Sequence, residues 1–208
     1  LALLGASGNG KSRACGTLPG KTLYLYTGGE KHGPLSAKSA GGNIIPIQID
    51  FNYDKKAPFA SSNESYTNLL SILKSTDQLA KLEIKNIVVD GLTELEQMIR
   101  GTLAYASKCK TSNGGHNTFA EGAATIDLMR PIMDALRDAQ RILKCNVVVT
   151  CLLDVKSVGD KKEILEASPK LTSYGVAASL IPQYDDILIV GRMQEDDKDI
   201  EYNFQMCG

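Results

Sequence analysis

The sequence of 208 residues predicts one α/β domain with a mostly parallel, twisted sheet, helices on both faces and a C-terminal antiparallel hairpin. Three observations favour this fold class. Short runs rich in Val, Ile and Leu alternate with segments whose apolar residues recur at helical spacing. A glycine-rich turn directly follows the first apolar run. Two further apolar runs close the chain, separated only by a short acidic segment at 195–199.

The first half of the chain is expected to alternate strands with helices. Pro19 and Gly20 stop the first helix early, so this helix must be short. Pro46 lies within an otherwise strand-like run, which indicates an edge strand. The expected elements are the end of a buried strand at 1–4, a helix over 11–17, strands over 22–26 and 44–49, a loop over 51–63 and a helix over 66–82.

The second half continues the alternation and ends in strands. Thr93 and Glu96 fit a capping box, which predicts a helix that starts at Thr93. Pro131 predicts a kink in a long helix. The expected elements are a strand over 84–90, the helix from 93, a mobile loop over 108–118, a helix over 119–144, a strand over 146–153, an irregular region with a short hairpin over 154–180, and strands over 187–193 and 200–206.

The composition is that of an ordinary globular protein, with 43% hydrophobic and 23% charged residues. A net charge of −1 excludes a whole-chain basic field for nucleic acid, so any such contact must be local. The five cysteines form no C-x-x-C pair, which fits a reducing compartment, and no apolar run reaches membrane-spanning length. We therefore expect a cytoplasmic protein without a membrane partner. Because the chain opens without Met and in a strand, we also expect residues to be missing at one or both ends.

The stretch Gly5–Ser12 carries the strongest functional signal. It reads Gly-Ala-Ser-Gly-Asn-Gly-Lys-Ser and fits the phosphate-binding pattern G-x-x-x-x-G-K-[ST] at every fixed position. Glycines let the backbone wrap an anion with its N–H groups, at the positive end of the helix that follows. We expect the nucleotide to be bound by Gly5, Ala6, Ser7, Gly8, Asn9, Gly10, Lys11, Ser12 and Arg13.

Nucleoside-triphosphate chemistry also needs an acid for the metal and a group that orients the attacking water. Asp90 ends the apolar run Ile87–Asp90, so we expect it to hold Mg²⁺ together with the Ser12 hydroxyl. Glu30 follows the second strand and is the expected general base, with Lys11 on the phosphates. Thr150 ends a later strand, where it serves either as a γ-phosphate sensor or as a satisfied core threonine. Glu94 and Glu96 read as first-turn helix acids, and Glu94 is a distant backup base.

With these parts in order, the chain resembles the RecA-like P-loop ATPases, and more narrowly the phage-encoded single-strand-annealing and recombination ATPases of the Sak group. The phosphate loop is followed by a very short helix and by Leu18–Lys21, and the second strand leads into Thr27–Glu30. The stretch Val88–Leu95 resembles the Walker-B strand of the family, with its trailing Thr. Segments 168–171 and 182–188 resemble the last loop and the returning strand, more loosely.

The resemblance implies an oligomeric Mg²⁺/ATP-dependent ATPase with ATP held between subunits, in a phage protein within the host cytoplasm. It also implies single-stranded DNA binding by two loops, here 108–118 and 154–175, although their lysines also fit ordinary solvated loops. A basic residue from a neighbouring subunit, such as Lys170 or Arg192, would complete the site. The chain departs from the family where Cys151–Leu153 follows Thr150 in place of a polar segment. The lysines of the two loops are Lys108, Lys110, Lys156, Lys161, Lys162 and Lys170.

Two other functions stay open from the sequence. The missing polar segment after Thr150 and the near-neutral charge favour a nucleotide-binding assembly protein with little turnover. A small-molecule kinase is disfavoured because the few arginines form no lid-like cluster. No N-K-x-D motif specifies guanine, so ATP is the expected nucleotide by default.

Overall fold

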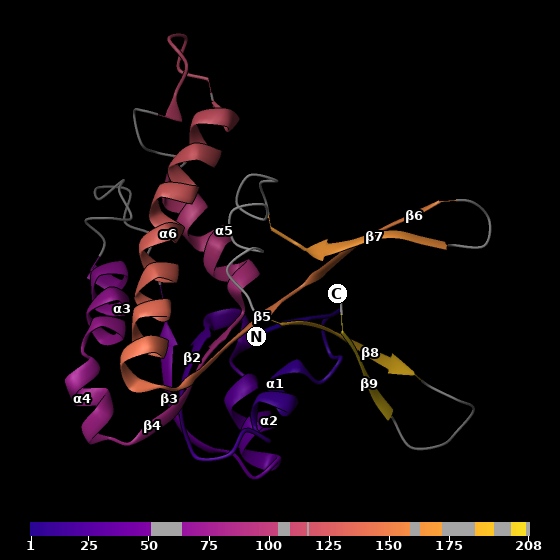
Figure 1. The fold of residues 1–208 in the computed structure, drawn as a ribbon. Helices are drawn as coiled ribbons and strands as arrows, with labels where there is room; N and C mark the ends of the chain where they lie inside the picture. Colours follow the sequence, from indigo (N-terminus) through magenta and orange to yellow (C-terminus); the bar gives the residue numbers. More distant parts are fainter. Residues whose placement is uncertain are drawn as a thin grey trace.

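The computed structural model of the protein describes residues 1–50, 64–103, 109–115, 117–158, 163–171, 186–193 and 201–206 (Figure 1). Within 155–168, 191–193 and 201–206 the description covers the backbone alone. The expected loop at 51–63 and the acidic segment at 195–199 lie outside the described residues.

A seven-stranded sheet with the order β3-β2-β4-β5-β1-β8-β9 forms the centre of the fold. The first six strands of this order pair in parallel, and β9 pairs antiparallel with β8. The α/β class, the mostly parallel sheet and the C-terminal hairpin are therefore confirmed. The strands are β1 (Ala2–Leu4), β2 (Lys21–Thr27), β3 (Asn43–Ile49), β4 (Ile84–Asp90), β5 (Asn146–Cys151), β8 (Ile187–Met193) and β9 (Glu201–Met206).

Helices cover both faces of the sheet, as expected. The strands alternate between two apolar clusters: Leu23 and Leu25 join the larger one, whereas Tyr24 between them joins the smaller one. The larger cluster includes residues of α3–α6, and the smaller one includes residues of α1 and α2. The helices are α1 (Lys11–Cys15), α2 (Gly33–Ser39), α3 (Glu64–Lys74), α4 (Thr76–Lys81), α5 (Leu92–Leu103) and α6 (Thr118–Leu143).

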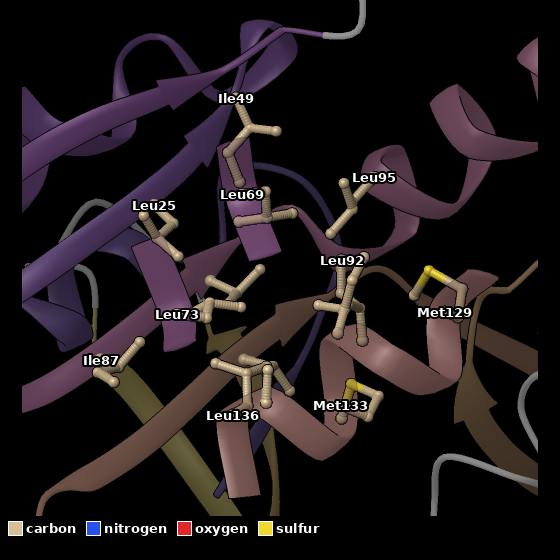
Figure 2. Packing of buried hydrophobic residues seen from close by; sticks show 14 of the residues in the cluster. Leu25, Ile49, Leu69, Leu73, Ile87, Leu92, Leu95, Met129, Met133 and Leu136 are labelled. Carbon is tan, nitrogen blue, oxygen red and sulfur yellow. The ribbon is translucent and has the colours of Figure 1, made fainter. Parts of the chain in front are cut away.

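The larger cluster is the main hydrophobic core. Figure 2 shows Leu69 and Leu73 of α3 facing Leu25 of β2, with Leu136 of α6 close by. Apolar area removed from water at about 25 cal/mol per Å² is the main term that stabilises such a core. In the part of the chain that the structure describes, no helix is long and apolar enough to cross a membrane.

The edge position of β3 is confirmed, because within the described part of the chain β3 pairs with β2 alone. Pro46 lacks a backbone N–H, and it is tolerated at an edge because no second strand there needs that donor. A short hairpin in the irregular region is also confirmed: β6 (Leu153–Val158) and β7 (Glu163–Pro169) form a separate two-stranded antiparallel sheet. Figure 1 shows this pair extending away from the main sheet.

Two local expectations were wrong. The capping box fails because α5 begins at Leu92, and the Thr93 hydroxyl accepts a hydrogen bond from the Leu152 N–H at 3.0 Å instead. The helix expected over 66–82 is two helices, which break at Ser75. Between β2 and β3 the chain also forms the 3-10 turn η1 (Gly28–Glu30) and α2, where Pro34 occupies the first turn.

The long helix α6 is close to its expected bounds. It runs through Pro131, and the Asn117 side chain caps it by accepting a hydrogen bond from the Ala120 N–H at 3.1 Å. Part of the loop expected over 108–118 lies outside the described residues; the rest includes Cys109, which is fully buried.

Candidate nucleotide-binding site

The phosphate loop lies between β1 and α1, at the carboxyl edge of the sheet. Gly8 and Gly10 have φ angles of 81° and 82°, which residues with a Cβ rarely adopt. Gly5 has a different reason to be glycine, since a Cβ there would lie 2.6 Å from the Val190 carbonyl oxygen. The Asn9 amide donates to the same carbonyl at 3.0 Å, so β8 holds the loop in place.

Lys11 is the central cation of this loop. Its Nζ donates to the carbonyl oxygens of Gly5 and Ala6, both at 2.9 Å, and the side chain is only 7% exposed. Burial lowers the pKa of Lys11, and the nearby carboxylates of Glu30 and Asp90 oppose that shift. An ammonium has three donors, so Lys11 can still donate to a phosphate oxygen beside the loop.

A cavity of about 300 Å³ opens beside the loop. Its lining includes seven of the nine residues expected to bind nucleotide, together with Glu30. Gly5 and Ala6 take part through their carbonyl bonds to Lys11. The lining residues are Ser7, Gly8, Asn9, Gly10, Lys11, Ser12, Arg13, Glu30, His32, Gly33 and Ser36.

Asp90 lies at the carboxyl end of β4 and is buried. The Tyr24 hydroxyl donates to Asp90 Oδ2, and the Thr150 hydroxyl donates to Oδ1 at 2.6 Å. Thr150 in turn accepts a hydrogen bond from the Gly91 N–H at 2.9 Å. This network fixes the orientation of the carboxylate. The Thr150 hydroxyl is thereby engaged with Asp90 and Gly91, while its role towards a γ-phosphate stays a prediction.

The expected metal ligands share one neighbour. Ser12 and Asp90 both lie close to Tyr24: the Tyr24 hydroxyl donates to Asp90, and burial together with the charge of Asp90 raises the pKa of Tyr24. Each carboxylate oxygen has two lone pairs, so Asp90 can accept from these hydroxyls and still face a hydrated cation. Ser12 and Asp90 therefore fit Mg²⁺, which takes few protein ligands. Among the described residues, no cluster of three or more His, Cys, Asp or Glu side chains could hold a metal by itself.

Glu30 ends η1 and lines both the main cavity and a smaller one of about 30 Å³. Lys11 also lines both cavities, so this pair lies between the phosphate loop and the ends of β4 and β5. Burial raises the pKa of Glu30, as does the charge of Asp90, whereas Lys11 lowers it. A carboxylate with a raised pKa beside a cation suits proton transfer from water.

Glu94 projects from the first turn of α5 towards η1. The Thr27 hydroxyl donates to its Oε2, and the Gly29 N–H donates to Oε1 and Oε2 at 3.0 and 3.1 Å. These contacts hold η1 against α5. The sequence predictions missed both Tyr24 and Thr27, although each is a polar residue in an apolar strand, which was the available signal.

The sequence-predicted site residues thus divide into two groups. The phosphate loop, Glu30, Asp90 and Thr150 lie together at the carboxyl edge of the parallel strands β1, β2, β4 and β5, as expected for an open α/β sheet. Of the proposed DNA-contacting lysines, Lys110 and Lys170 are exposed. Lys108, Lys161 and Lys162 lie outside the described residues, as do the side chains of Lys156 and Arg192.

No protein-family model matches this chain, and the search of curated proteins finds no relative. The site chemistry is therefore what supports a function.

Proposed function

We propose that the protein binds Mg²⁺ and ATP at the phosphate loop and hydrolyses the nucleotide as a RecA-like ATPase. One observation carries the proposal: the loop with Lys11, the acid Glu30 and the strand-end Asp90 converge at the carboxyl edge of the sheet. A glycine-rich turn without function would not need a buried lysine facing two carboxylates. Charged groups are costly to bury unless they are paired, so this arrangement supports a functional role.

The chain supplies the binding and the positioning. Backbone N–H groups of Gly8 and Gly10 face the phosphates, and Lys11 donates to the β- and γ-phosphate oxygens. Mg²⁺, when bound by Ser12 and Asp90, neutralises negative charge on the phosphates. Tyr24 and Thr150 keep the Asp90 carboxylate oriented, because both hydroxyls donate to it.

Glu30 is the proposed general base. It accepts a proton from water while the water oxygen forms a bond to the γ-phosphorus. The bond between that phosphorus and the bridging oxygen breaks, which releases ADP and inorganic phosphate, and Glu30 then returns the proton to solvent. Since Glu30 must be ionised, turnover should fall as the pH drops through its raised pKa.

We further propose that the ATPase acts as an oligomer on single-stranded DNA, in recombination or annealing. Support comes from the exposed Lys110 and Lys170, and from the β6–β7 pair, which extends from the main sheet within the expected DNA-contacting segment (Figure 1). Lysines in such segments neutralise phosphates without reading sequence.

Two assays test the proposal. We expect Mg²⁺-dependent phosphate release from ATP that Lys11→Ala abolishes, with Lys38→Ala on the exposed side of α2 as a control. A salt titration of single-strand binding with and without ATP tests the DNA part. Unchanged ATP affinity in Lys11→Ala would contradict the nucleotide site, and no DNA binding at low salt in any nucleotide state would contradict the DNA part.

One observation favours a second candidate, a nucleotide-binding assembly protein with little turnover. The Thr150 hydroxyl is engaged by Asp90 and Gly91, and the next residue is the buried Cys151, whose pKa burial raises to about 12. A neutral thiol offers little hydrogen bonding to a phosphate. ATP binding without phosphate release would favour this candidate over the ATPase.

A further inference from the structure

The acid Glu30 belongs to a short turn that has little support of its own. The turn η1 has three residues, and the side chain of Thr27 at its N-cap forms no capping hydrogen bond. A single 3-10 turn is easily deformed, since its hydrogen-bond geometry is poor. A base needs its carboxylate at a defined distance from the attacking water, so something outside the turn must fix it.

Glu94 supplies that support. Its carboxylate accepts hydrogen bonds from the Thr27 hydroxyl before η1 and from the Gly29 N–H within η1. Such bonds to an ionised acceptor are about twice as strong as neutral ones. Because Glu94 is on α5, whose Leu92 and Leu95 are part of the main core, the turn is tied to a rigid element.

Glycines make this close approach feasible. A Cβ at Gly29 would overlap the Glu94 carboxylate, to which its three nearest heavy atoms all belong. Gly91 begins the connection to α5 with φ 97°, and a Cβ there would lie 2.6 Å from Thr27 Oγ1 and 3.0 Å from Glu30 Cγ. The segment 27–30 and the start of α5 are therefore packed directly against each other.

We propose that Glu94 is a positioning residue for hydrolysis: it fixes η1 so that the Glu30 carboxylate faces the phosphate loop, and it takes no proton itself. This inference rests on the proposed function. Both Glu94 oxygens accept hydrogen bonds from the turn, and Glu94 lines the smaller cavity but not the one beside the phosphate loop, whereas Glu30 lines both. The two acids thus have separate roles, and Glu30 alone accepts the proton from the attacking water.

Glu94 also affects Glu30 through its charge. Burial raises the pKa of Glu30, the charge of Asp90 raises it further, Lys11 lowers it, and Glu94 adds the smallest upward contribution. Arg13 of α1 and His32 before α2 line the same cavity. Removing the Glu94 charge while its hydrogen bonds remain should therefore shift the acid limb of turnover to lower pH. The positioning role itself is tested by the difference between a variant that keeps these hydrogen bonds and one that loses them.

The experiment compares Glu94→Gln, Glu94→Ala and Glu30→Gln in the full chain, with Mg²⁺-ATP turnover, ATP affinity and the pH profile as readouts. Glutamine can accept from the Gly29 N–H and donate to the Thr27 oxygen, so we expect Glu94→Gln to keep turnover within about fivefold. Alanine releases the turn, and we expect kcat to fall about 100-fold, as for a misplaced catalytic group. Glu30→Gln should lose about 10²- to 10⁴-fold. Gln97→Ala, exposed on the same helix, is the control.

A second variant, Gly29→Ala, keeps the proposal testable if Glu94→Ala does not fold. Gly29→Ala pushes the flexible Glu94 carboxylate away without changing Glu94, so it should reduce kcat as Glu94→Ala does. In the Glu94→Ala background it should add no further loss, which a double-mutant cycle measures. Gly101→Ala is the matched glycine control, because a Cβ there meets nothing within 4 Å.

The outcomes are distinguishable. Retained turnover in Glu94→Gln with a pH profile moved to lower pH supports the positioning role. Equal losses in Glu94→Gln and Glu94→Ala, or additive losses in the Gly29→Ala, Glu94→Ala double variant, would overturn it while the ATPase itself stands. No turnover in the unchanged protein would overturn the proposed function and this role together.

Discussion

The two faces of the sheet are built for different purposes. On the face covered by α3–α6, the strands contribute Leu23, Leu25, Ile87 and Val89 to a large, mainly apolar cluster. On the face covered by α1 and α2, the apolar cluster is much smaller and includes Tyr24, whose hydroxyl bonds to Asp90. Both faces include buried polar groups: in the larger cluster, the Tyr66 hydroxyl donates to the Leu128 carbonyl oxygen at 2.7 Å. On the second face, however, the polar group within the cluster bonds to Asp90, a residue of the candidate site.

This difference indicates where stability and function reside. Apolar burial on the α3–α6 face stabilises the fold, and every substitution there acts mainly on the free energy of unfolding. On the α1–α2 face, each buried polar group needs a partner, so a substitution alters the site as well as the stability. Four substitutions test whether stability and nucleotide binding depend on different faces of the sheet.

Lys11→Ala should have the largest effect. Loss of two or more charge-assisted hydrogen bonds at about 1.5–3 kcal/mol each raises the ATP dissociation constant about 100-fold or more, which amounts to no measurable binding. Isothermal calorimetry with Mg²⁺-ATP measures it, and urea unfolding should show a much smaller change in stability. A loss of stability as large as the loss of affinity would mean that the two faces are not separated.

Leu136→Ala probes the opposite face. Leu136 of α6 is 1% exposed in the main cluster, so its truncation should lower the free energy of unfolding by about 2–5 kcal/mol (Figure 2). ATP affinity of the folded protein should not change. Ile142→Ala, on the same helix but 56% exposed, should change stability by less than about 0.5 kcal/mol. A shift in ATP affinity in Leu136→Ala would contradict the separation.

Asp90→Asn should weaken the Mg²⁺-dependent part of ATP binding. The amide keeps the shape of the side chain and can still bond to the two hydroxyls, but it removes the charge that attracts the cation. We expect affinity in Mg²⁺ to fall about 10- to 100-fold, which corresponds to about 1.4–2.8 kcal/mol, and affinity in EDTA to change little. An equal loss with and without Mg²⁺ would show that Asp90 has only a structural role.

The meeting of the site residues at one edge of the sheet could be inferred from the sequence, because parallel strands place their carboxyl ends together. The motif at Gly5–Ser12 and the strand-end Asp90 each follow an apolar run, and the structure places both at one edge of the sheet. The fold class followed from the same alternation of apolar runs with helical periodicity. These signals are local, so they can be read without knowing the tertiary contacts.

The missed features depend on contacts between distant segments. Thr93 matched a capping box, but its hydroxyl accepts from the Leu152 N–H, fifty-nine residues away. Glu94 was predicted to be an acid in the first turn of a helix, yet its carboxylate also accepts a hydrogen bond from the Gly29 N–H of a distant segment. Nothing in the local sequence distinguishes these partners, because a capping residue and a long-range acceptor have the same chemical type.

Tyr24→Phe should have the smallest effect. Tyr24 both packs in the smaller apolar cluster and bonds to the site residue Asp90. The substitution keeps the ring in the α1–α2 cluster and removes only the donor to Asp90 Oδ2. A hydrogen bond of about 1 kcal/mol corresponds to about a fivefold change, so ATP affinity in Mg²⁺ should fall by that factor while affinity in EDTA stays the same. Tyr26→Phe is the matched control, because the Tyr26 hydroxyl makes only an exposed bond to Gln48 at 3.3 Å. If Tyr24→Phe lowered stability but left the Mg²⁺ dependence unchanged, Tyr24 would serve packing alone, and the orientation of Asp90 would depend on Thr150.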